Sequence, residues 1–207
     1  MTEYVVSRYG TGALVSIKNE PDDGVSVTPL SLSNSLLPLG YIARLGLDTI
    51  LIENLDSFEG LEESLRGLRI SEEAIRGSKL AIVHTDYSQG LDNEKVASLL
   101  GVSQNDLFKL HQETLWQVEL IGFAPGFPYL APLGNKELWE KVGRLATPRS
   151  KVPKGSVAVA AGLSSIYPEA MPGGWHLIGI TEFNLFDDTL DEPAFLKIGD
   201  TIRFEAI

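Results

Sequence analysis

Apolar residues along the first eighty positions follow two spacings, one typical of strands and one typical of helices. Short β-branched runs indicate strands, and the apolar residues between 57 and 68 recur at i, i+3 and i+4, which predicts an amphipathic helix capped near Ser57. A helix is also predicted from Ser31 to Leu45, with Ser31 or Ser33 as its cap. Pro38 must either interrupt this helix or begin it. The predicted strands cover residues 4–6, 13–17, 49–52 and 80–84, and the predicted helices cover 31–45, 57–68 and 71–76.

The pattern changes after residue 90. Asp92 can cap a helix that ends at Gly101, and Ser103 with Asp106 resembles a capping box that opens a second helix reaching His111. Short β-type runs then alternate with connections rich in glycine and proline, a pattern typical of a β-barrel or sandwich. These runs cover residues 115–120, 156–160, 176–180 and 201–205.

These elements predict an α+β fold with two domains. Residues 1–86 form a small α/β unit, and residues 87–207 form the β-barrel. The chain of 207 residues, 43% of them hydrophobic, is long enough for a substantial core.

Composition narrows the classes of function. The formal net charge of −11 disfavours a general affinity for nucleic acid or for an anionic membrane. No cysteine is present, which excludes thiolate catalysis, and the N-terminus shows no signal peptide, so we expect a cytoplasmic protein. No apolar run is long enough to predict a membrane span. The three histidines, His84, His111 and His176, lie far apart, and we therefore expect no metal site.

Eight of the eleven prolines lie between Pro125 and Pro193, which indicates loops held in specific turns. The first such segment is GFAPGFPYL, residues 122–130. Its alternating aromatic residues either plug the barrel or face a ligand, and the residues alone leave both readings open.

The second segment, RLATPRSKVPKGS, is basic. Between Gly122 and Ile180 the chain has six basic and three acidic residues, although it is acidic overall. Such a region suits an anionic small molecule or an acidic partner surface, because arginine binds carboxylates through paired hydrogen bonds. A solvated charged face is the alternative.

The third segment, IYPEAMPGGWHLIG, places a Gly-Gly turn before Trp175 and His176. His176 is either a catalytic base or a hydrogen-bonded core residue. No nucleophile elbow, Walker A motif or dinucleotide fingerprint occurs in the chain. The residues alone therefore predict a shaped, locally basic loop face and no particular reaction.

These three segments, followed by LFD and EPAFLKIGD, occur in an order that resembles one known family. They resemble the B-type subunit of the bacterial 5-oxoprolinase, a family also described as KipI-type kinase inhibitors and as allophanate hydrolase subunit 1. The segments are also similar to subdomains C and D of the carboxyltransferase region of urea carboxylase. The resemblance covers about residues 85–207.

The resemblance implies that the barrel is cyclophilin-like and that the chain acts with two partners, a C-type and an A-type subunit. Such complexes cleave 5-oxo-L-proline to L-glutamate using ATP. Since this chain has no nucleotide motif, ATP would be used through the complex. Two alternatives stay open, namely a regulatory protein that inhibits a sensor histidine kinase and a biotin-dependent carboxyltransferase module.

The resemblance also implies a substrate-binding site, whereas the catalytic residues stay unassigned. The two arginines of the second motif would bind a carboxylate such as that of 5-oxoproline. If Arg149 serves only the ligand, Arg149→Ala should leave the thermal melt nearly unchanged. Leu163-Ser164-Ser165 stands where the family has a polar Gln-Thr-Gly. The implied site residues are Phe123, Pro125, Gly126, Phe127, Tyr129, Arg144, Arg149, Pro153, Gly155, Ser156, Tyr167, Pro168, Gly173, Gly174, Trp175 and His176.

Overall fold

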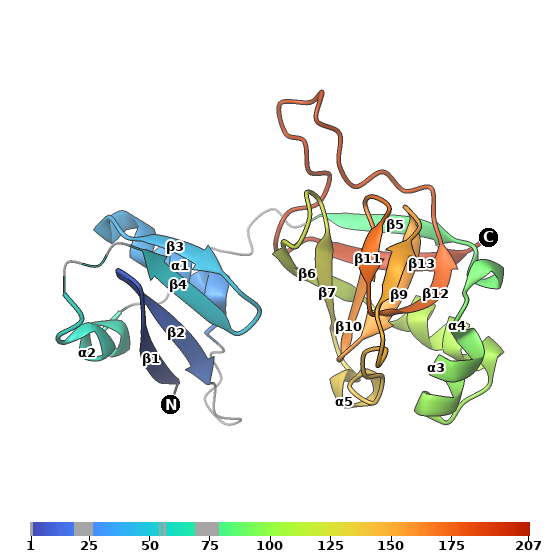
Figure 1. Ribbon diagram of the computed structural model, residues 1–207, viewed down its shortest axis with the longest axis horizontal. Helices are drawn as coiled ribbons and strands as arrows, with labels where there is room; N and C mark the ends of the chain where they lie inside the picture. Colours follow the sequence, from blue (N-terminus) through green and yellow to red (C-terminus); the bar gives the residue numbers. More distant parts are fainter. Residues whose placement is uncertain (1, 19–26, 54, 56, 69–78) are drawn as a thin grey trace. The chain divides into compact units, whose positions relative to one another are not determined.

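Two compact units make up the chain, Met1–Arg76 and Gly77–Ile207. The computed structural model (Figure 1) describes residues 2–18, 27–53, 55, 57–68 and 79–207. The division lies ten positions before the boundary expected at residues 86/87. The reason is that residues 80–85 form a strand that pairs with the last strand of the second unit.

The first unit is a four-stranded antiparallel sheet with two helices. Its strand order is β1-β2-β4-β3, and apolar residues of β2 such as Val15 and Ile17 alternate into a core shared with Leu32 and Leu36 of the first helix. The elements are β1 (Glu3–Tyr9), β2 (Gly12–Lys18), α1 (Pro29–Leu36), β3 (Ile42–Leu45), β4 (Thr49–Glu53) and α2 (Leu61–Arg66).

Two of the three helices predicted in this unit are described, and both are shorter than expected. Thr28, not Ser31 or Ser33, caps α1, and the chain passes through a 3₁₀ turn, η1 (Leu37–Leu39), to Gly40 at φ 86°. This left-handed glycine ends the helix, so the residues expected to continue it form strand β3 instead. Gly60, not Ser57, precedes α2. The helix predicted at 71–76 lies outside the described residues.

The second unit contains a seven-stranded sheet of order β12-β9-β10-β7-β6-β13-β5. It is nearly closed: Asp86, just after β5, exchanges two backbone hydrogen bonds with Ile180 at the end of β12. The predicted barrel is therefore confirmed. Its strands are β5 (Leu80–Thr85), β6 (Trp116–Ile121), β7 (Pro128–Pro132), β9 (Ser156–Ala160), β10 (Leu163–Ile166), β12 (His176–Ile180) and β13 (Thr201–Ala206).

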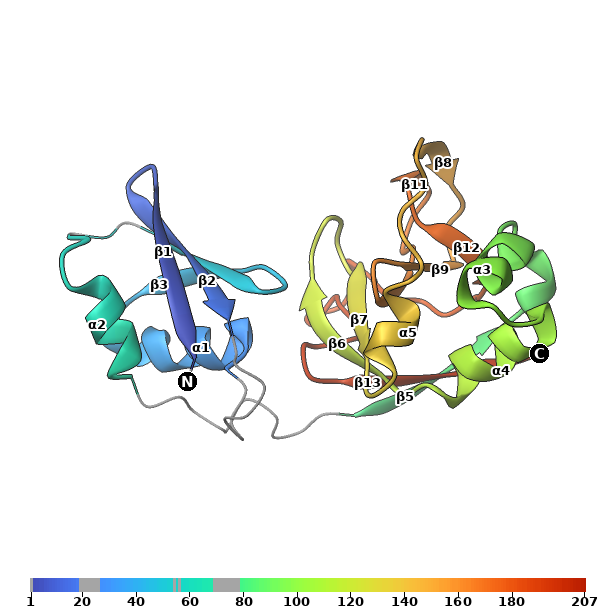
Figure 2. The same cartoon turned by 90° about the horizontal axis from the view of Figure 1, so that it is seen from below.

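Helices and a small second sheet surround this barrel. Figure 2 shows α3 (Asn93–Leu100) beside α4 (Gln104–Glu113), and the β8–β11 pair at another edge of the unit. Ser103 caps α4 as predicted, because its hydroxyl oxygen accepts from the Asp106 N–H. The remaining elements are η3 (Tyr87–Gln89), α5 (Lys136–Trp139), β8 (Arg149–Val152) and β11 (Met171–Gly173). No described helix is both long and apolar enough to cross a bilayer.

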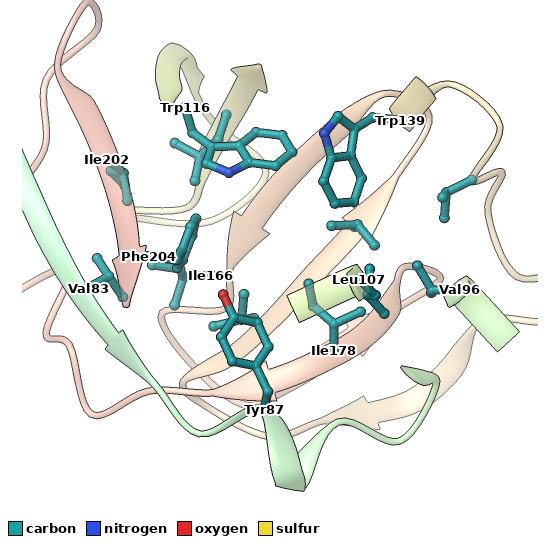
Figure 3. Packing of buried hydrophobic residues seen from close by; sticks show 14 of the residues in the cluster. Val83, Tyr87, Val96, Leu107, Trp116, Trp139, Ile166, Ile178, Ile202 and Phe204 are labelled. Carbon is teal, nitrogen blue, oxygen red and sulfur yellow. The ribbon is translucent and has the colours of Figure 1, made fainter. Parts of the chain in front are cut away.

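Large apolar side chains fill the barrel, among them Trp116, Trp139 and Phe204 (Figure 3). The long connection from β12 to β13 completes this core, since Leu185 and Leu196 are buried in it. The same connection then projects outward beyond the sheet, as the dark red loop of Figure 1 shows.

Three polar side chains form a hydrogen-bonded chain inside this apolar core, and we call Tyr87, His111 and Ser164 the interior polar chain. The Tyr87 hydroxyl lies 2.8 Å from His111 Nδ1, and His111 Nε2 lies 3.0 Å from Ser164 Oγ. Ser164 Oγ donates to the carbonyl of Ala158. It therefore accepts from Nε2–H, which leaves Nδ1 to accept from tyrosine, and every member has a partner.

Burial determines the protonation states of His111 and Tyr87 in the interior polar chain. It lowers the pKa of His111 to about 3 and raises that of Tyr87, so both side chains are neutral near pH 7. Because His111 already directs a proton at Ser164, it is not placed to act as a base toward that serine. The interior polar chain therefore ties α4 to β9 and β10 and stabilises the fold.

Candidate functional site

The three proline-rich motifs converge on one cluster in the second unit. The first motif is the turn between β6 and β7, the second leads through β8 into β9, and the third runs from β10 through β11 into β12. Side chains from all three pack together, separately from the barrel core. We call Phe127, Tyr129, Tyr167 and Trp175 the aromatic cluster.

The rings of the aromatic cluster contact one another mainly edge to face. Phe127 lies at its centre, with ring centroids 5.2 Å from Tyr129, 5.2 Å from Tyr167 and 6.0 Å from Trp175. Phe123 adds a fifth ring, 5.4 Å from Phe127. Such geometry adds to the stability given by burial alone. The aromatic side chains of the first motif thus gather as expected, with Phe127 buried and Tyr129 half-buried.

Phe123 is the exception, because it is 69% exposed and has a φ of 70°, which is unusual for a bulky residue. Pro125 beside it is also exposed. Gly126, at φ 74°, is required here because an added Cβ would lie 2.8 Å from Phe186 Cβ. The turn therefore presents one aromatic ring to solvent above a buried aromatic wall.

The charges of two arginines act on the tyrosine hydroxyls of this cluster. Burial raises the pKa of Tyr167, while hydrogen bonding to the Trp175 backbone and the charges of Arg149 and Arg144 oppose the rise. Burial likewise raises the pKa of Tyr129, and Arg144 opposes it. The charge of Arg144 thus acts on both hydroxyls and that of Arg149 on Tyr167 alone, and we call this side of the cluster its polar edge.

Arg149 is already engaged within the fold. Its Nη2 donates to Asp92 Oδ1 at 2.7 Å, and its Nη1 donates to the carbonyl of Trp175 at 3.3 Å. The other oxygen of Asp92 accepts from the Leu177 N–H at 2.6 Å. Since the Arg149 side chain is only 27% exposed, it holds α3 to β12, and its loss should destabilise the fold.

Asp92 is the residue of this site that the sequence did not reveal. It stands at the N-cap position of α3, as predicted, but its side chain makes no capping hydrogen bond. Its carboxylate instead reaches Arg149, which is 57 positions away. Local sequence favours a cap at such a position, and no local signal identifies a distant partner.

Arg144 is exposed and differs from Arg149 in having no ion pair among the described residues. Its backbone is fixed nearby, because Leu145 N–H donates to the carbonyl of Gly174 at 2.8 Å. Arg144 is therefore the cation of this edge that is available to bind an anionic ligand.

His176 and Ser156 are buried and not placed to react with a ligand. His176 is 3% exposed, and its Nδ1 finds no hydrogen-bond partner among the described residues. Burial lowers the His176 pKa, and the charge of Asp92 opposes this. Ser156 is buried at the start of β9. His176 is therefore a buried residue, as the core alternative expected, but the hydrogen bond that this alternative implied for Nδ1 is not found among the described residues.

Most of the small residues of the motifs serve backbone packing. Gly155 has a φ of 79°, and an added Cβ would lie 2.1 Å from the carbonyl oxygen of Thr181. An added Cβ on Gly173 would lie 2.1 Å from the Tyr167 hydroxyl, so this glycine makes room for the ring. Gly174 is half-buried beside Pro148, Pro168 is buried, and Pro153 is exposed.

The segment Leu163-Ser164-Ser165 lies in β10 and points its serines inward. Ser164 belongs to the interior polar chain, and Ser165 Oγ donates to the carbonyl of Pro128 at 2.7 Å. Both serines are fully buried. Leu163, in contrast, is half-buried and packs against the aromatic cluster, so this substitution relative to the family pattern changes both the barrel interior and the wall of the cluster. No cluster of histidine and acidic side chains suited to a metal occurs among the described residues.

Residues 43–196 match the family model described as carboxyltransferase domain, subdomain C and D. The chain belongs to this carboxyltransferase subdomain C and D family. It is also 36% identical over 161 residues to the B subunit of the Escherichia coli O157:H7 5-oxoprolinase, a match that covers 75% of this chain and 72% of that protein.

Solved structures agree with this family. TTHA0988 superposes with a TM-score of 0.72 at 29% identity, over 95% of this chain and 40% of that longer protein. The Kluyveromyces lactis urea amidolyase, at 16% identity, shares the fold with a TM-score of 0.73 over 99% of this chain and 15% of its own length. The family suggested by the sequence motifs is confirmed by the family model and by the 5-oxoprolinase B subunits, and these structures show that the fold is shared.

Proposed function

We propose that this carboxyltransferase-family chain is the B-type subunit of an ATP-dependent complex that hydrolyses 5-oxo-L-proline to L-glutamate. Relatives at 35–36% identity are named as the B subunit of 5-oxoprolinase. The observation that supports the proposal in this chain is Arg144, an exposed cation without an ion pair among the described residues, whose charge acts on the half-buried Tyr129 of the aromatic cluster.

The proposed role of these residues is binding and orientation. The Arg144 guanidinium pairs with the carboxylate of 5-oxoproline, the hydroxyl of the half-buried Tyr129 donates a hydrogen bond to it, and the exposed Phe123 ring covers the apolar face of the substrate ring. His176 and Ser156 are too buried to reach the amide. Hydrolysis and the use of ATP therefore need groups from an A-type and a C-type partner subunit.

Reconstitution tests this proposal. The full chain is mixed with candidate A-type and C-type subunits, and ATP-dependent glutamate release from 5-oxoproline is measured with each subunit omitted in turn. Activity that requires all three supports the proposal. Its absence from a correctly assembled complex would overturn it.

The same preparation separates the alternatives. A stable complex with the dimerisation domain of a histidine kinase, and none with a C-type subunit, would support the regulatory hypothesis instead. Carboxyl transfer from a biotinylated carrier without glutamate release would support the carboxyltransferase hypothesis.

A further inference from the structure

A pocket of about 730 Å³ lies at the seam where the barrel closes, and the proposed reaction does not use it. This volume is in the range of ordinary ligand sites. We call it the seam pocket, and it is lined by Ile82, His84, Asp86, Lys154, Gly155, Ile180, Thr181, Glu182, Phe183 and Ile207.

The seam is closed at one end and open at the other. Asp86 and Ile180 exchange backbone hydrogen bonds of 2.8 and 3.0 Å, and Thr181 Oγ1 donates to the carbonyl of His84. Beyond Thr181 the chain no longer pairs with β5. Phe183 instead packs edge to face on Phe195, with ring centroids 4.9 Å apart.

The register of β5 shows which of its backbone groups face the open seam. The carbonyls of Lys79 and Thr85 accept from β13, so odd-numbered residues between them direct their N–H and C=O groups to that strand. The backbone N–H and C=O groups of even-numbered residues face away from β13. Those of Asp86 bond to Ile180, and the carbonyl of His84 accepts from Thr181.

Leu80 and Ile82 therefore present backbone donors and acceptors to the seam. No partner for these groups occurs among the residues that the structure describes. The Ile82 side chain is 47% exposed and lines the pocket. Alternate residues of a strand lie about 7 Å apart, the spacing at which an added strand would pair.

We propose that the open edge of β5 and the seam pocket together take up an extended, apolar and weakly basic peptide segment of a partner protein as an added strand. The segment pairs with the backbone groups that Ile82 turns to the seam and places an apolar side chain against Ile82, Ile180 and Phe183. The inference does not depend on the reaction proposed above.

The charge of the pocket lining determines whether the bound segment should be basic or acidic. Asp86 and Glu182 outnumber Lys154 in the pocket lining, and the chain as a whole carries a net charge of −11. A basic segment is therefore attracted, whereas an acidic one is repelled. A small ligand would meet the pocket walls but would leave the row of strand-spaced backbone groups unpaired.

Selection from a displayed library of random linear peptides on the full chain tests the proposal. We expect recovered peptides to alternate apolar residues and to be enriched in lysine or arginine. Binding should weaken about tenfold in Ile82→Pro, because proline removes the N–H that faces the seam but none that β13 uses. Ile82→Thr keeps this N–H and the β-branched shape, and it should bind nearly as well as the unaltered chain.

Hydrogen exchange on the unaltered chain gives a second readout that needs no variant to fold. The amide of Ile82 should exchange rapidly in the free protein and become protected when a selected peptide binds. The neighbouring amides of Ala81 and Val83 should be protected throughout, since they bond to β13. Three outcomes would overturn the proposal. The selected peptides could leave the exchange of the Ile82 amide unchanged, could bind Ile82→Pro as well as the unaltered chain, or could be mainly acidic.

Discussion

The interior polar chain and the aromatic cluster contain similar residue types in opposite settings. Inside the barrel, Tyr87, His111 and Ser164 are all buried and all hydrogen-bonded. At the aromatic cluster, polar groups lie at an edge, where Arg149 has an ion-pair partner among the described residues but Arg144 does not. A serine, a histidine and a tyrosine joined by hydrogen bonds resemble catalytic machinery, yet here all three are buried, whereas the Arg144 side chain beside the aromatic cluster is exposed. Access, not residue type, separates the structural site from the proposed binding site.

Replacement of His111 tests the structural half of this comparison and should have the largest effect. His111→Ala removes two hydrogen bonds and leaves a cavity among Trp116, Trp139 and Phe204. We expect a loss of about 3–5 kcal/mol in the free energy of unfolding. Urea denaturation followed by tryptophan fluorescence measures it, because all three tryptophans lie in the second unit. His84→Ala, an exposed histidine on β5, is the control and should change little; equal losses would contradict the structural role.

Low pH should destabilise the fold through His111 of the interior polar chain. The pKa of His111 is lowered to about 3 in the folded protein from 6.5, so between these values the unfolded state binds more protons. Stability is therefore complete above about pH 6.5 and falls as the pH drops toward 3, by at most about 1.4 kcal/mol per unit. Urea midpoints between pH 7 and 4 should show a shallower slope in His111→Gln than in the unaltered chain. Parallel slopes would show that another group dominates.

Arg149→Ala should have an intermediate effect on stability, contrary to the expectation of an unchanged melt. The substitution leaves the largely buried Asp92 carboxylate with only the Leu177 N–H, and we expect a loss of about 1–3 kcal/mol. Lys151→Ala, an exposed residue of the same strand, is the control. Combining Arg149→Ala with Asp92→Asn should recover part of the loss. If Arg149→Ala costs no more than Lys151→Ala, the contact does not hold the fold.

Arg144→Ala should affect stability least and ligand binding most. An exposed arginine at such a position contributes within about 0.5 kcal/mol to folding. Loss of a charge-assisted hydrogen bond should raise the KM for 5-oxoproline in the assembled complex by roughly tenfold to hundredfold. Lys141→Ala, at an exposed lysine three positions before Arg144, should leave KM unchanged. A lowered melt with an unchanged KM would mean that the roles of Arg144 and Arg149 are reversed.

Local signals predicted those parts of the fold that local interactions determine. The cap at Ser103 and the strands around β9, β12 and β13 are where the sequence places them. The helix expected to reach Leu45 ends early, because Gly40 takes a left-handed conformation and β3 gains a full set of pairings with β4. Strand β7 was concealed inside the proline-rich motif, since its two prolines lie at its ends, where a strand tolerates them.

The sequence predicted which aromatic residues of the candidate site lie together, but it did not predict the contacts of the two arginines. The motifs correctly indicated that Phe127, Tyr167 and Trp175 belong together, although 48 positions separate the first from the last. The sequence could not distinguish Arg149 from Arg144, because the partner of Arg149 lies in a distant helix cap. The contact of Arg149 with its partner forms only in the completed barrel, so it leaves no pattern in the neighbouring sequence.

The pairing of β5 with β13 has a consequence for synthesis of the chain on the ribosome. Lys79 and Asp200, which hydrogen-bond to each other, lie 121 positions apart, and β13 is the only strand with a full ladder to β5 among the described residues. At ordinary translation rates, β5 would wait roughly 6 to 24 s for that partner. During this time Ala81 and Val83, which are buried in the finished barrel, would be exposed on the nascent chain, so residues 80–85 are a segment at which association with other chains competes with folding.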